Sequence, residues 1–342
     1  MKDIGYLGID VGSISTNIAV IEPAGGVLFT LYARGGGDPI RSVQTGLQEI
    51  REELSENFRI AGVCTTGSGR NLIGAVVGAD LIKNEIVTHA RAVLHLHPNA
   101  RTIFEIGGQD SKVTIIQDGV VVGFAMNLVC AAGTGSFLDS QAKRLQITTE
   151  ELSEMSILSE NPTDIAGRCT VFAESDMIHK QQIGHDQKDI TMGLCHALVR
   201  NYLNNVCRGN DLRPPYVLQG GVSANKGIRR ALEQALDCEV IIPRYNMVMG
   251  AYGAALRAAS AGIEKTRFRG YVVSDRDVAT RSFQCEDCSN DCEIIEIADQ
   301  GEVIGNCGGR CGKWEAQKRV PVDSTGVGAP AVGPRRTPSW LR

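Results

Sequence analysis

One pattern occurs twice in this chain, about a hundred residues apart, and it restricts the fold more than any other feature. Each copy consists of an apolar strand, a glycine-rich polar turn and a second strand. The first copy spans residues 6–21 and the second spans residues 101–116. Repetition of a supersecondary unit indicates a duplicated architecture. We therefore expect two similarly built α/β halves.

Further segments extend both halves. Residues 39–54 have helical periodicity, with apolar side chains on one face. The dipeptide Asp118-Gly119 is a hairpin signal. Helices are expected to dominate residues 135–205, and a helix at 247–259 is expected to close the core. Additional strands are predicted at residues 26–32, 60–65, 120–124 and 215–218.

The composition is that of a soluble globular protein. Of its 342 residues, 43% are hydrophobic and 22% are charged, and the formal net charge is -4. This charge gives no reason to expect nucleic acid or an anionic membrane as a partner. The amino terminus lacks a signal-peptide pattern, and no apolar run reaches the roughly 18 residues that span a bilayer. We expect a cytoplasmic protein, in which eleven cysteines indicate metal sites or redox chemistry rather than disulfides.

Three glycine-rich turns that directly follow strands predict a nucleotide site. Glycine lets backbone N–H groups approach phosphate oxygens, and serine or threonine hydroxyls add donors. Asp10 and Asp110 stand at strand ends, where they could hold Mg²⁺ through water. One such turn would be an ordinary tight turn, but three in this order favour a nucleotide between two lobes, and the Walker A and Rossmann glycine motifs are absent from the sequence. The predicted nucleotide-binding residues are Gly12, Ser13, Ser15, Thr16, Gly107, Gly108, Gly220, Gly221, Val222 and Asn225.

Two cysteines, Cys130 and Cys169, stand where helices are expected to begin. At such a position a thiolate meets unpaired N–H groups and the positive end of the helix dipole, which favours a metal ligand or a reactive thiol. Two ligands are half of what a four-cysteine iron–sulfur or zinc site needs. A second copy of the chain is the simplest source of the other half.

Five more cysteines gather near the carboxyl end of the chain. Turn-forming residues between them would let their thiolates converge on a metal ion. We prefer zinc, with a second iron–sulfur cluster as the alternative; zinc needs four cysteines, so one is left over. These five are Cys285, Cys288, Cys292, Cys307 and Cys311.

The remaining cysteines and the first histidines are expected to have structural roles only. Cysteine in an apolar or helical surrounding is by default a small buried side chain. The histidines His89, His95 and His97 are expected to lie on the surface of a helix. The cysteines concerned are Cys64, Cys195, Cys207 and Cys238.

The order of the three turns resembles that of the actin, sugar kinase and heat-shock chaperone ATPase superfamily. Within it, the sequence is similar to the ATP-dependent activators of 2-hydroxyacyl-CoA dehydratases and the ATPase subunits of benzoyl-CoA reductases, the BadF/BadG/BcrA/BcrD type. The resemblance covers about residues 4–260. Glu105 stands where the superfamily usually has aspartate, so Asp110 is the safer candidate for a metal role. The closest matches are Ile9-Asp10-Val11-Gly12-Ser13, Ile106-Gly107-Gly108-Gln109-Asp110-Ser111-Lys112, Cys130-Ala131-Ala132-Gly133-Thr134-Gly135-Ser136-Phe137-Leu138 and Gly167-Arg168-Cys169-Thr170-Val171-Phe172-Ala173-Glu174-Ser175.

The resemblance implies an ATPase coupled to electron transfer. Such activators are homodimers in which one 4Fe-4S cluster bridges the subunits, so Cys130 and Cys169 would be the ligands from each chain. A ferredoxin or flavodoxin would supply the electron, ATP with Mg²⁺ would bind and be hydrolysed to ADP, and the electron would pass at low potential to an acyl-CoA dehydratase or reductase. Asp10, Gln109 and Asp110 are the catalytic candidates. For Gln109, orienting the attacking water and capping a turn are equally supported.

The resemblance also implies a domain order. It predicts an α/β, two-lobed, actin-like (ribonuclease H-like) fold, with residues 1–98 and 247–262 in lobe I and residues 99–246 in lobe II. A cysteine-rich metal-binding segment at 263–318 and a disordered tail at 319–342 would follow. That segment resembles the stretch after the activator in longer fused members, and a truncated or rearranged reading frame would explain the Pro/Gly/Ala-rich ending.

Two alternative functions remain open at the level of sequence. A sugar or acetate-type kinase of the same fold would need a catalytic base in the cleft and would leave Cys130 and Cys169 without a role. A non-enzymatic nucleotide-dependent regulator would bind ATP without a chromophore. The sequence does not specify which dehydratase or reductase, or which acyl-CoA, would be involved.

Overall fold

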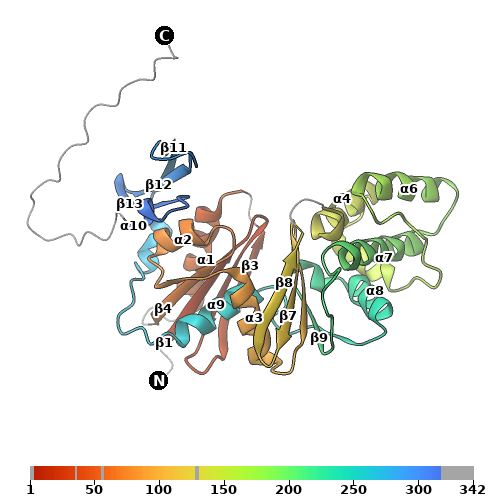
Figure 1. Ribbon diagram of the computed structural model, residues 1–342, viewed down its shortest axis with the longest axis horizontal. Coiled ribbons are helices and arrows are strands. Elements are labelled where there is room, and N and C mark those ends of the chain that lie inside the picture. The colour runs from red at the N-terminus through yellow and green to blue at the C-terminus, as the bar shows by residue number, and fades with distance from the viewer. Residues whose placement is uncertain (1–3, 35–36, 55–57, 128–130, 317–342) are drawn as a thin grey trace, which may run out of the picture.

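The structure is a computed structural model that describes residues 4–34, 37–54, 58–127 and 131–316. Figure 1 shows the two largest sheets, and their strands follow the same order. The first is β3-β2-β1-β4-β5 and the second, read in the same sense, is β8-β7-β6-β9-β10. In the first sheet β1 is antiparallel to β2 and parallel to β4. In the second sheet β6 is likewise antiparallel to β7 and parallel to β9. The duplicated sheet core expected from the repeated pattern is thereby confirmed.

Lobe I is the name we give to the first sheet and the helices that pack on it. The helix α9 covers the sheet by packing on β1 and β4, and it also packs on α3. The predicted helices at 39–54 and 247–259 are confirmed within two residues at each end. The elements of lobe I are β1 (Ile4–Val11), β2 (Ser15–Ile21), β3 (Val27–Arg34), α1 (Pro39–Glu53), β4 (Arg59–Thr66), α2 (Arg70–Val77), β5 (Leu81–Ile82), α3 (Glu85–Leu96) and α9 (Met249–Ala259).

Lobe II is the second sheet together with the helices beside it, which form the right half of Figure 1. The hairpin between β7 and β8 has Asp118 and Gly119 at positive φ, as its sequence predicts. The nearly buried helix α7 packs against α5, α6 and α8. The elements of lobe II are β6 (Thr102–Ile106), β7 (Ser111–Gln117), β8 (Val120–Met126), η1 (Ala131–Gly133), α4 (Gly135–Leu145), α5 (Thr149–Ser156), α6 (Thr170–Gln182), α7 (Gln187–Asn205), β9 (Tyr216–Gln219), η2 (Gly221–Ala224), α8 (Lys226–Leu236) and β10 (Val240–Ile241).

A continuous apolar cluster joins the two lobes. Ala19 and Ile21 of lobe I and Ile103 and Val217 of lobe II belong to one buried cluster with side chains of α3 and α9. Burial of this surface keeps the sheets together behind the cleft. The open side of the cleft, where the turns after the strands meet, is left for a ligand.

The segment after α9 forms a small antiparallel sheet that packs against lobe I. Its sheet lies beside α1 and α2 in Figure 1, and Gly305 packs directly against Ala75 of α2. Ile297 and Cys307 belong to the buried cluster of lobe I. This packing ties the segment to the core. Its elements are η3 (Tyr271–Asp275), β11 (Val278–Gln284), β12 (Glu293–Asp299), β13 (Glu302–Cys307) and α10 (Lys313–Ala316).

Two further predictions concern a disordered tail and membrane-spanning segments. The tail predicted to be disordered, residues 319–342, lies outside the described residues. Within the described ranges, no helix combines the length and apolarity that crossing a bilayer demands.

Candidate nucleotide site

Two adjoining cavities lie between the lobes, and the three predicted turns line them. The larger has a volume of about 440 Å³ and the smaller about 170 Å³. Ile14, Tyr32, Gly108, Gly221 and Met247 line both, so the cavities form one continuous cleft. The remaining predicted turn residues divide between them as follows: Gly12, Ser13, Ser15, Gly107, Gln109, Asp110 and Gly220 line the smaller cavity, and Val222 and Asn225 line the larger.

Thr16 is the exception among the predicted nucleotide-binding residues. It is buried in β2, where it pairs with Val11 on one side and Ala33 on the other. Within the described residues it lines neither cavity. The side-chain alternation of the strand places it on the core face, whereas Ser13 and Ser15 remain at the turn.

A buried cluster of charged side chains forms the floor of the smaller cavity. Lys112 Nζ lies 3.0 Å from Glu105 Oε1 and 2.9 Å from Asp110 Oδ2. His89 Nδ1 lies 3.5 Å from Glu105 Oε2, and its Nε2 lies 3.8 Å from Asp10 Oδ2. The amide of Gln219 contacts His89 Nδ1 at 2.8 Å. Strands of both lobes and α3 therefore meet in this cluster.

The prediction that His89 lies on the surface is wrong. The residue is 8% exposed and faces Asp10 and Glu105. Helical periodicity shows that residues 85–96 form a helix, but it does not show that the first turns of the helix face a polar cleft. His95, six residues further along the same helix, is exposed as expected.

Burial and neighbouring charges set the proton affinities in this cluster. Burial, reinforced by Glu105 and Glu85, raises the pKa of Asp10 above its ordinary value of 3.8. Burial alone would raise the pKa of Glu105 as well, but His89 and Lys112 outweigh it and lower that pKa. Burial would lower the pKa of Lys112, yet Glu105 and Asp110 raise it. The lysine is thus held charged between two carboxylates.

The side chains of the smaller cavity suit a divalent cation held largely through water, since within the described ranges no three of its acidic or histidine side chains are arranged to bind a metal ion directly. Among the described residues that line the smaller cavity, four are carboxylates and only Lys112 and His89 can oppose them. The carboxylate of Asp10 is closely enclosed, because a Cβ on Gly67 or Gly250 would approach its oxygens to 2.5 Å and 2.1 Å. Asn17 Oδ1, in the same lining, is buried and has no hydrogen-bond partner among the described residues. Hard oxygen donors with uncompensated negative charge are what Mg²⁺ binds.

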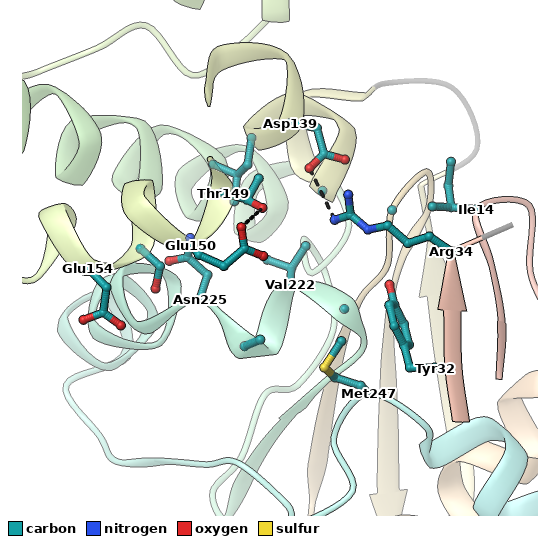
Figure 2. A pocket seen from close by; sticks show the side chains of 16 residues that line it. Ile14, Tyr32, Arg34, Asp139, Thr149, Glu150, Glu154, Val222, Asn225 and Met247 are labelled. Atoms are coloured by element: carbon teal, nitrogen blue, oxygen red, sulfur yellow. Dashed lines mark hydrogen bonds and ion pairs between the residues drawn. The ribbon is translucent and has the colours of Figure 1, made fainter. Parts of the chain in front are cut away.

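The larger cavity is lined by residues of α4, α5 and η2, by the N-cap of α8 and by the end of β3 (Figure 2). Thr149 and Glu150 stand at the start of α5, whose first turn is fixed by a capping box between Thr148 and Glu151. Asn225 caps α8 by accepting the N–H of Ile228 at 3.0 Å. A mixed apolar and polar lining of this size suits a nucleoside next to the phosphate turns.

Side chains of lobe I reach lobe II across the cleft. Arg34 Nη2 lies 3.6 Å from Asp139 Oδ1, the pair drawn in Figure 2. A Cβ on Gly221 would stand 3.0 Å from the Tyr32 hydroxyl, and a Cβ on Gly108 would stand 2.8 Å from Ile14 Cγ1. Gly108 and Gly221 therefore permit the close approach of the two lobes.

Gly108→Ala is expected to weaken nucleotide binding about tenfold, because the new methyl group would hold the two phosphate turns apart. Isothermal titration with ADP measures the effect. The second change Ile14→Ala removes Cγ1 and Cγ2, two of the three atoms that the methyl group meets, but keeps Cβ at 3.0 Å, so it should restore part of the affinity. Unchanged affinity in the single variant, or no recovery in the double variant, would contradict this steric account.

The helix α4 is attached directly to the second phosphate turn. The N–H groups of Gly135 and Ser136 donate to the carbonyls of Gly107 and Gly108 at 2.8 Å and 2.7 Å. The first N–H groups of α4 are thus used by the turn. These bonds link the turn to α4, which follows η1, the segment after Cys130.

Of the two cysteines predicted to bind the cluster, the structure describes Cys169 but not Cys130. Cys130 lies outside the described residues. The first helical residues after it are those of the short 3₁₀ helix η1, which begins at Ala131, and the α-helix α4 begins at Gly135. The prediction that a helix begins at Cys130 itself stays a prediction. Cys169 is the N-cap of α6, and its side chain is half-buried and makes no capping hydrogen bond. This thiol is available at a helix N-terminus, as expected.

The tail cysteines do not share one environment. Cys307 is buried in the hydrophobic cluster of lobe I, whereas Cys285, Cys288, Cys292 and Cys311 are half-buried or exposed. The indole N–H of Trp314 donates to Cys285 Sγ at 3.3 Å. In the ranges that the structure covers, no three His, Cys, Asp or Glu side chains are arranged to hold a metal ion. The predicted tail metal site therefore stays a prediction, with Cys307 as its least suitable member.

The other cysteines lie as expected. Cys64, Cys195 and Cys207 are buried, and Cys238 is half-buried. Burial raises the pKa of each of the first three thiols to about 12, which keeps them protonated and unreactive.

Sequence reasoning gave no role to Lys112, although a signal was present. The connection between β6 and β7 is a short turn, so the antiparallel register places Lys112 directly opposite Glu105. A lysine and a glutamate paired within two apolar strands indicate a buried ion pair. The contacts of His89 with Asp10, Glu105 and Gln219 depend on packing between the lobes, so no local sequence pattern predicts them.

Comparisons with known proteins agree with this geometry. The sequence matches the BadF/BadG/BcrA/BcrD ATPase family over residues 7–258. It is 35% identical over 255 residues to the (R)-2-hydroxyglutaryl-CoA dehydratase activating ATPase of Acidaminococcus fermentans, covering 74% of this chain and 96% of that protein. It is 33% identical over 268 residues to the activator of lactoyl-CoA dehydratase of Anaerotignum propionicum, covering 76% and 99%.

A solved structure extends the agreement to three dimensions. The activator of the 2-hydroxyisocaproyl-CoA dehydratase from Clostridium difficile, with bound ADPNP, superimposes with a TM-score of 0.69 at 33% identity, covering 75% of this chain and 95% of that one. The two-lobed actin-like fold is confirmed by this match and by the repeated strand order. The chain belongs to the BadF/BadG/BcrA/BcrD ATPase family.

Proposed function

We propose that this protein is an ATP-hydrolysing activator that works as a homodimer with a bridging 4Fe-4S cluster and delivers a low-potential electron to a 2-hydroxyacyl-CoA dehydratase or a related reductase. The observation that carries this proposal is the pair of hydrogen bonds from α4 to Gly107 and Gly108. They join the turn that would hold phosphate to the segment that follows Cys130. Relatives named as dehydratase activators support the same role.

The nucleotide would lie along the continuous cleft. The turns at Gly12 and Gly107 would bind phosphate oxygens through backbone N–H groups, and the nucleoside would occupy the larger cavity beside Val222 and Asn225. Bound Mg²⁺ would neutralise phosphate charge, with Asp10 and Asp110 as the residues that would hold it. Lys112, fixed by Glu105 and Asp110, adds positive charge at the floor. The exposed amide of Gln109 in the same turn is the candidate that orients water.

The residues around Cys169 fit a ligand shared with a second copy of the chain. Only Ala173 and Met177 of α6 are buried, and Val171 and Phe172, next to the thiol, are each 67% exposed. Exposed apolar groups around a ligand position are covered when a partner supplies the remaining ligands. A cluster held there would supply one-electron transfer. The N–H groups of the first turn of α6 would stabilise its negative charge.

The further partners and the tail metal are also proposals. A ferredoxin or flavodoxin would be the electron donor, and an acyl-CoA dehydratase or reductase component the acceptor. Cys285, Cys288, Cys292 and Cys311 are the proposed ligands of zinc, or of a second iron–sulfur cluster, in the tail. All four thiols are half-buried or exposed, and the N–H of Cys285 donates to the carbonyl of Cys292 at 2.8 Å, which brings these two residues together.

Anaerobic purification tests the function. We expect a brown dimer with about four iron atoms, which hydrolyses ATP and loses its reduced-cluster signal on adding ATP and an oxidised dehydratase component. A colourless, iron-free dimer or monomer that phosphorylates a sugar or acetate would instead establish a kinase and overturn the proposal. Binding of ATP without hydrolysis and without a chromophore would establish a regulator.

A further inference from the structure

One buried helix, α7, contacts the phosphate side of the cleft. The hydroxyl of Tyr202, which is fully buried, donates to the main-chain carbonyl of Lys112 at 2.7 Å. The side chain of that same lysine is paired with Glu105 and Asp110 on the floor of the smaller cavity. Tyr202 therefore links α7 to β7, the strand that carries Lys112.

The Tyr202 hydroxyl remains a donor under all ordinary conditions. Burial, together with Cys207, raises the pKa of Tyr202 well above its ordinary value of 10.0. The hydroxyl itself is fully buried, and a buried donor without a partner is costly. The bond should therefore be kept when β7 moves, and α7 should follow the strand.

The adjacent residue on α7 contacts both cysteine loops. Asn201 is 3% exposed, and its Nδ2 donates to the carbonyls of Gly167 at 2.7 Å and Arg168 at 3.3 Å, directly before Cys169. Its Oδ1 is buried without a partner in the described part of the chain and lies 3.0 Å from where a Cβ on Gly133 would stand. The side chain of Asn201 therefore lies next to both the loop before Cys169 and the turn after Cys130.

Glycine makes this close packing possible. A Cβ on Gly167 would stand 2.8 Å from the carbonyl oxygen of Ala197 on α7. The loop before Cys169 thus lies against the helix backbone, with little room to move independently of it. Two consecutive residues of a rigid helix connect the lysine strand with the Cys169 loop.

We propose that Tyr202 and Asn201 are positioning residues that transmit the nucleotide state of the cleft from β7 to Cys169. This inference rests on the proposed function, because it assumes that the cleft binds ATP. It adds a second connection to the one through α4. The phosphate turn reaches the Cys130 side through α4, and the lysine strand reaches Cys169 through α7.

The reactivity of the Cys169 thiol tests the proposal without iron. The full-length chain, prepared without iron, is treated with iodoacetamide in ADP or in the non-hydrolysable analogue ADPNP, both with Mg²⁺. The rate is read from the tryptic peptide that begins at Cys169 and ends at Lys180, which separates this thiol from the other ten. The quantity compared is the ratio of the two rates.

In the wild-type protein we expect the ratio to differ from one by about fivefold, the low end of typical coupling between sites. Tyr202→Phe removes only the hydroxyl and should bring the ratio to within about twofold of one, with nucleotide affinity nearly unchanged. Asn201→Leu should do the same. Tyr216→Phe is the matched control, because Tyr216 packs on Phe104 as Tyr202 does, and it should keep the wild-type ratio.

Each outcome decides between the alternatives. A nucleotide-dependent ratio that survives in Tyr202→Phe overturns the proposal, even if Asn201→Leu proves too unstable to measure. A wild-type chain that binds both nucleotides but shows equal rates also overturns it and leaves the proposed ATPase standing. A wild-type chain that binds neither nucleotide overturns both.

Discussion

Cys169→Ser is expected to abolish iron binding while leaving the fold intact. Cys169 is an N-cap whose side chain makes no capping bond, and serine is among the preferred N-cap residues. The substitution therefore removes a thiolate ligand and offers α6 a capping hydroxyl worth about 1 kcal/mol. The iron content of the anaerobically purified variant should fall from about four atoms per dimer to almost none, and the visible absorption should be lost.

Thermal unfolding separates loss of a ligand from loss of structure. Without iron, the variant should unfold at the same temperature as the iron-free wild type or slightly above it. Cys238→Ser is the control, since Cys238 is a half-buried cysteine of the same lobe outside the cluster motifs, and its iron should be unchanged. A Cys169→Ser protein that keeps its full iron content would show that Cys169 is not a ligand. Zinc that remains in this variant would belong to the tail.

Asp10→Asn is expected to lower the rate of ATP hydrolysis by about a hundredfold or more. The carboxylate is enclosed at the floor of the smaller cavity, where its charge would hold Mg²⁺ and, through it, the phosphates. Asparagine has nearly the same shape, so the surrounding packing should survive. The rate is measured as phosphate release at saturating ATP and Mg²⁺, with Asp118→Asn in the exposed hairpin as control.

The same variant should be more stable than the wild type when no nucleotide is present. Because burial raises the pKa of Asp10 above 3.8, the folded protein binds this proton more tightly than the unfolded chain. The contribution to stability is therefore full below pH 3.8 and is lost as the pH rises through the folded-state pKa. At neutral pH the ionised carboxylate destabilises the empty site, and asparagine removes that cost.

The pH dependence provides the check. The melting temperature of Asp10→Asn should exceed that of the wild type at pH 7, and the difference should vanish below pH 3.8, where the carboxyl is protonated in both states. Saturating Mg²⁺ and nucleotide should also reduce the difference, because they stabilise the ionised carboxylate of the wild type. A variant less stable than the wild type at pH 7 would contradict this account of the empty site.

Local sequence patterns predicted much of the fold because they depend on short-range physics. Strand alternation and glycine turns repeat within each half, and a repeated pattern yields the repeated strand order β3-β2-β1-β4-β5 and β8-β7-β6-β9-β10. The pairing of Glu105 with Lys112 follows from a short turn and could have been read from the sequence as well. In contrast, the burial of His89 and the start of α4 at Gly135 depend on packing against distant segments.

By itself the sequence determined the duplicated α/β core, the glycine-rich turns that line the cleft and the resemblance to the family. Only the tertiary structure decided how these parts connect. It placed His89 between two buried carboxylates, attached α4 to Gly107 and Gly108, and set Tyr202 and Asn201 of α7 between Lys112 and the Cys169 loop. The physical reason is that a residue's type and spacing fix its local conformation, whereas its partners across an interface are fixed by which buried surfaces pack together.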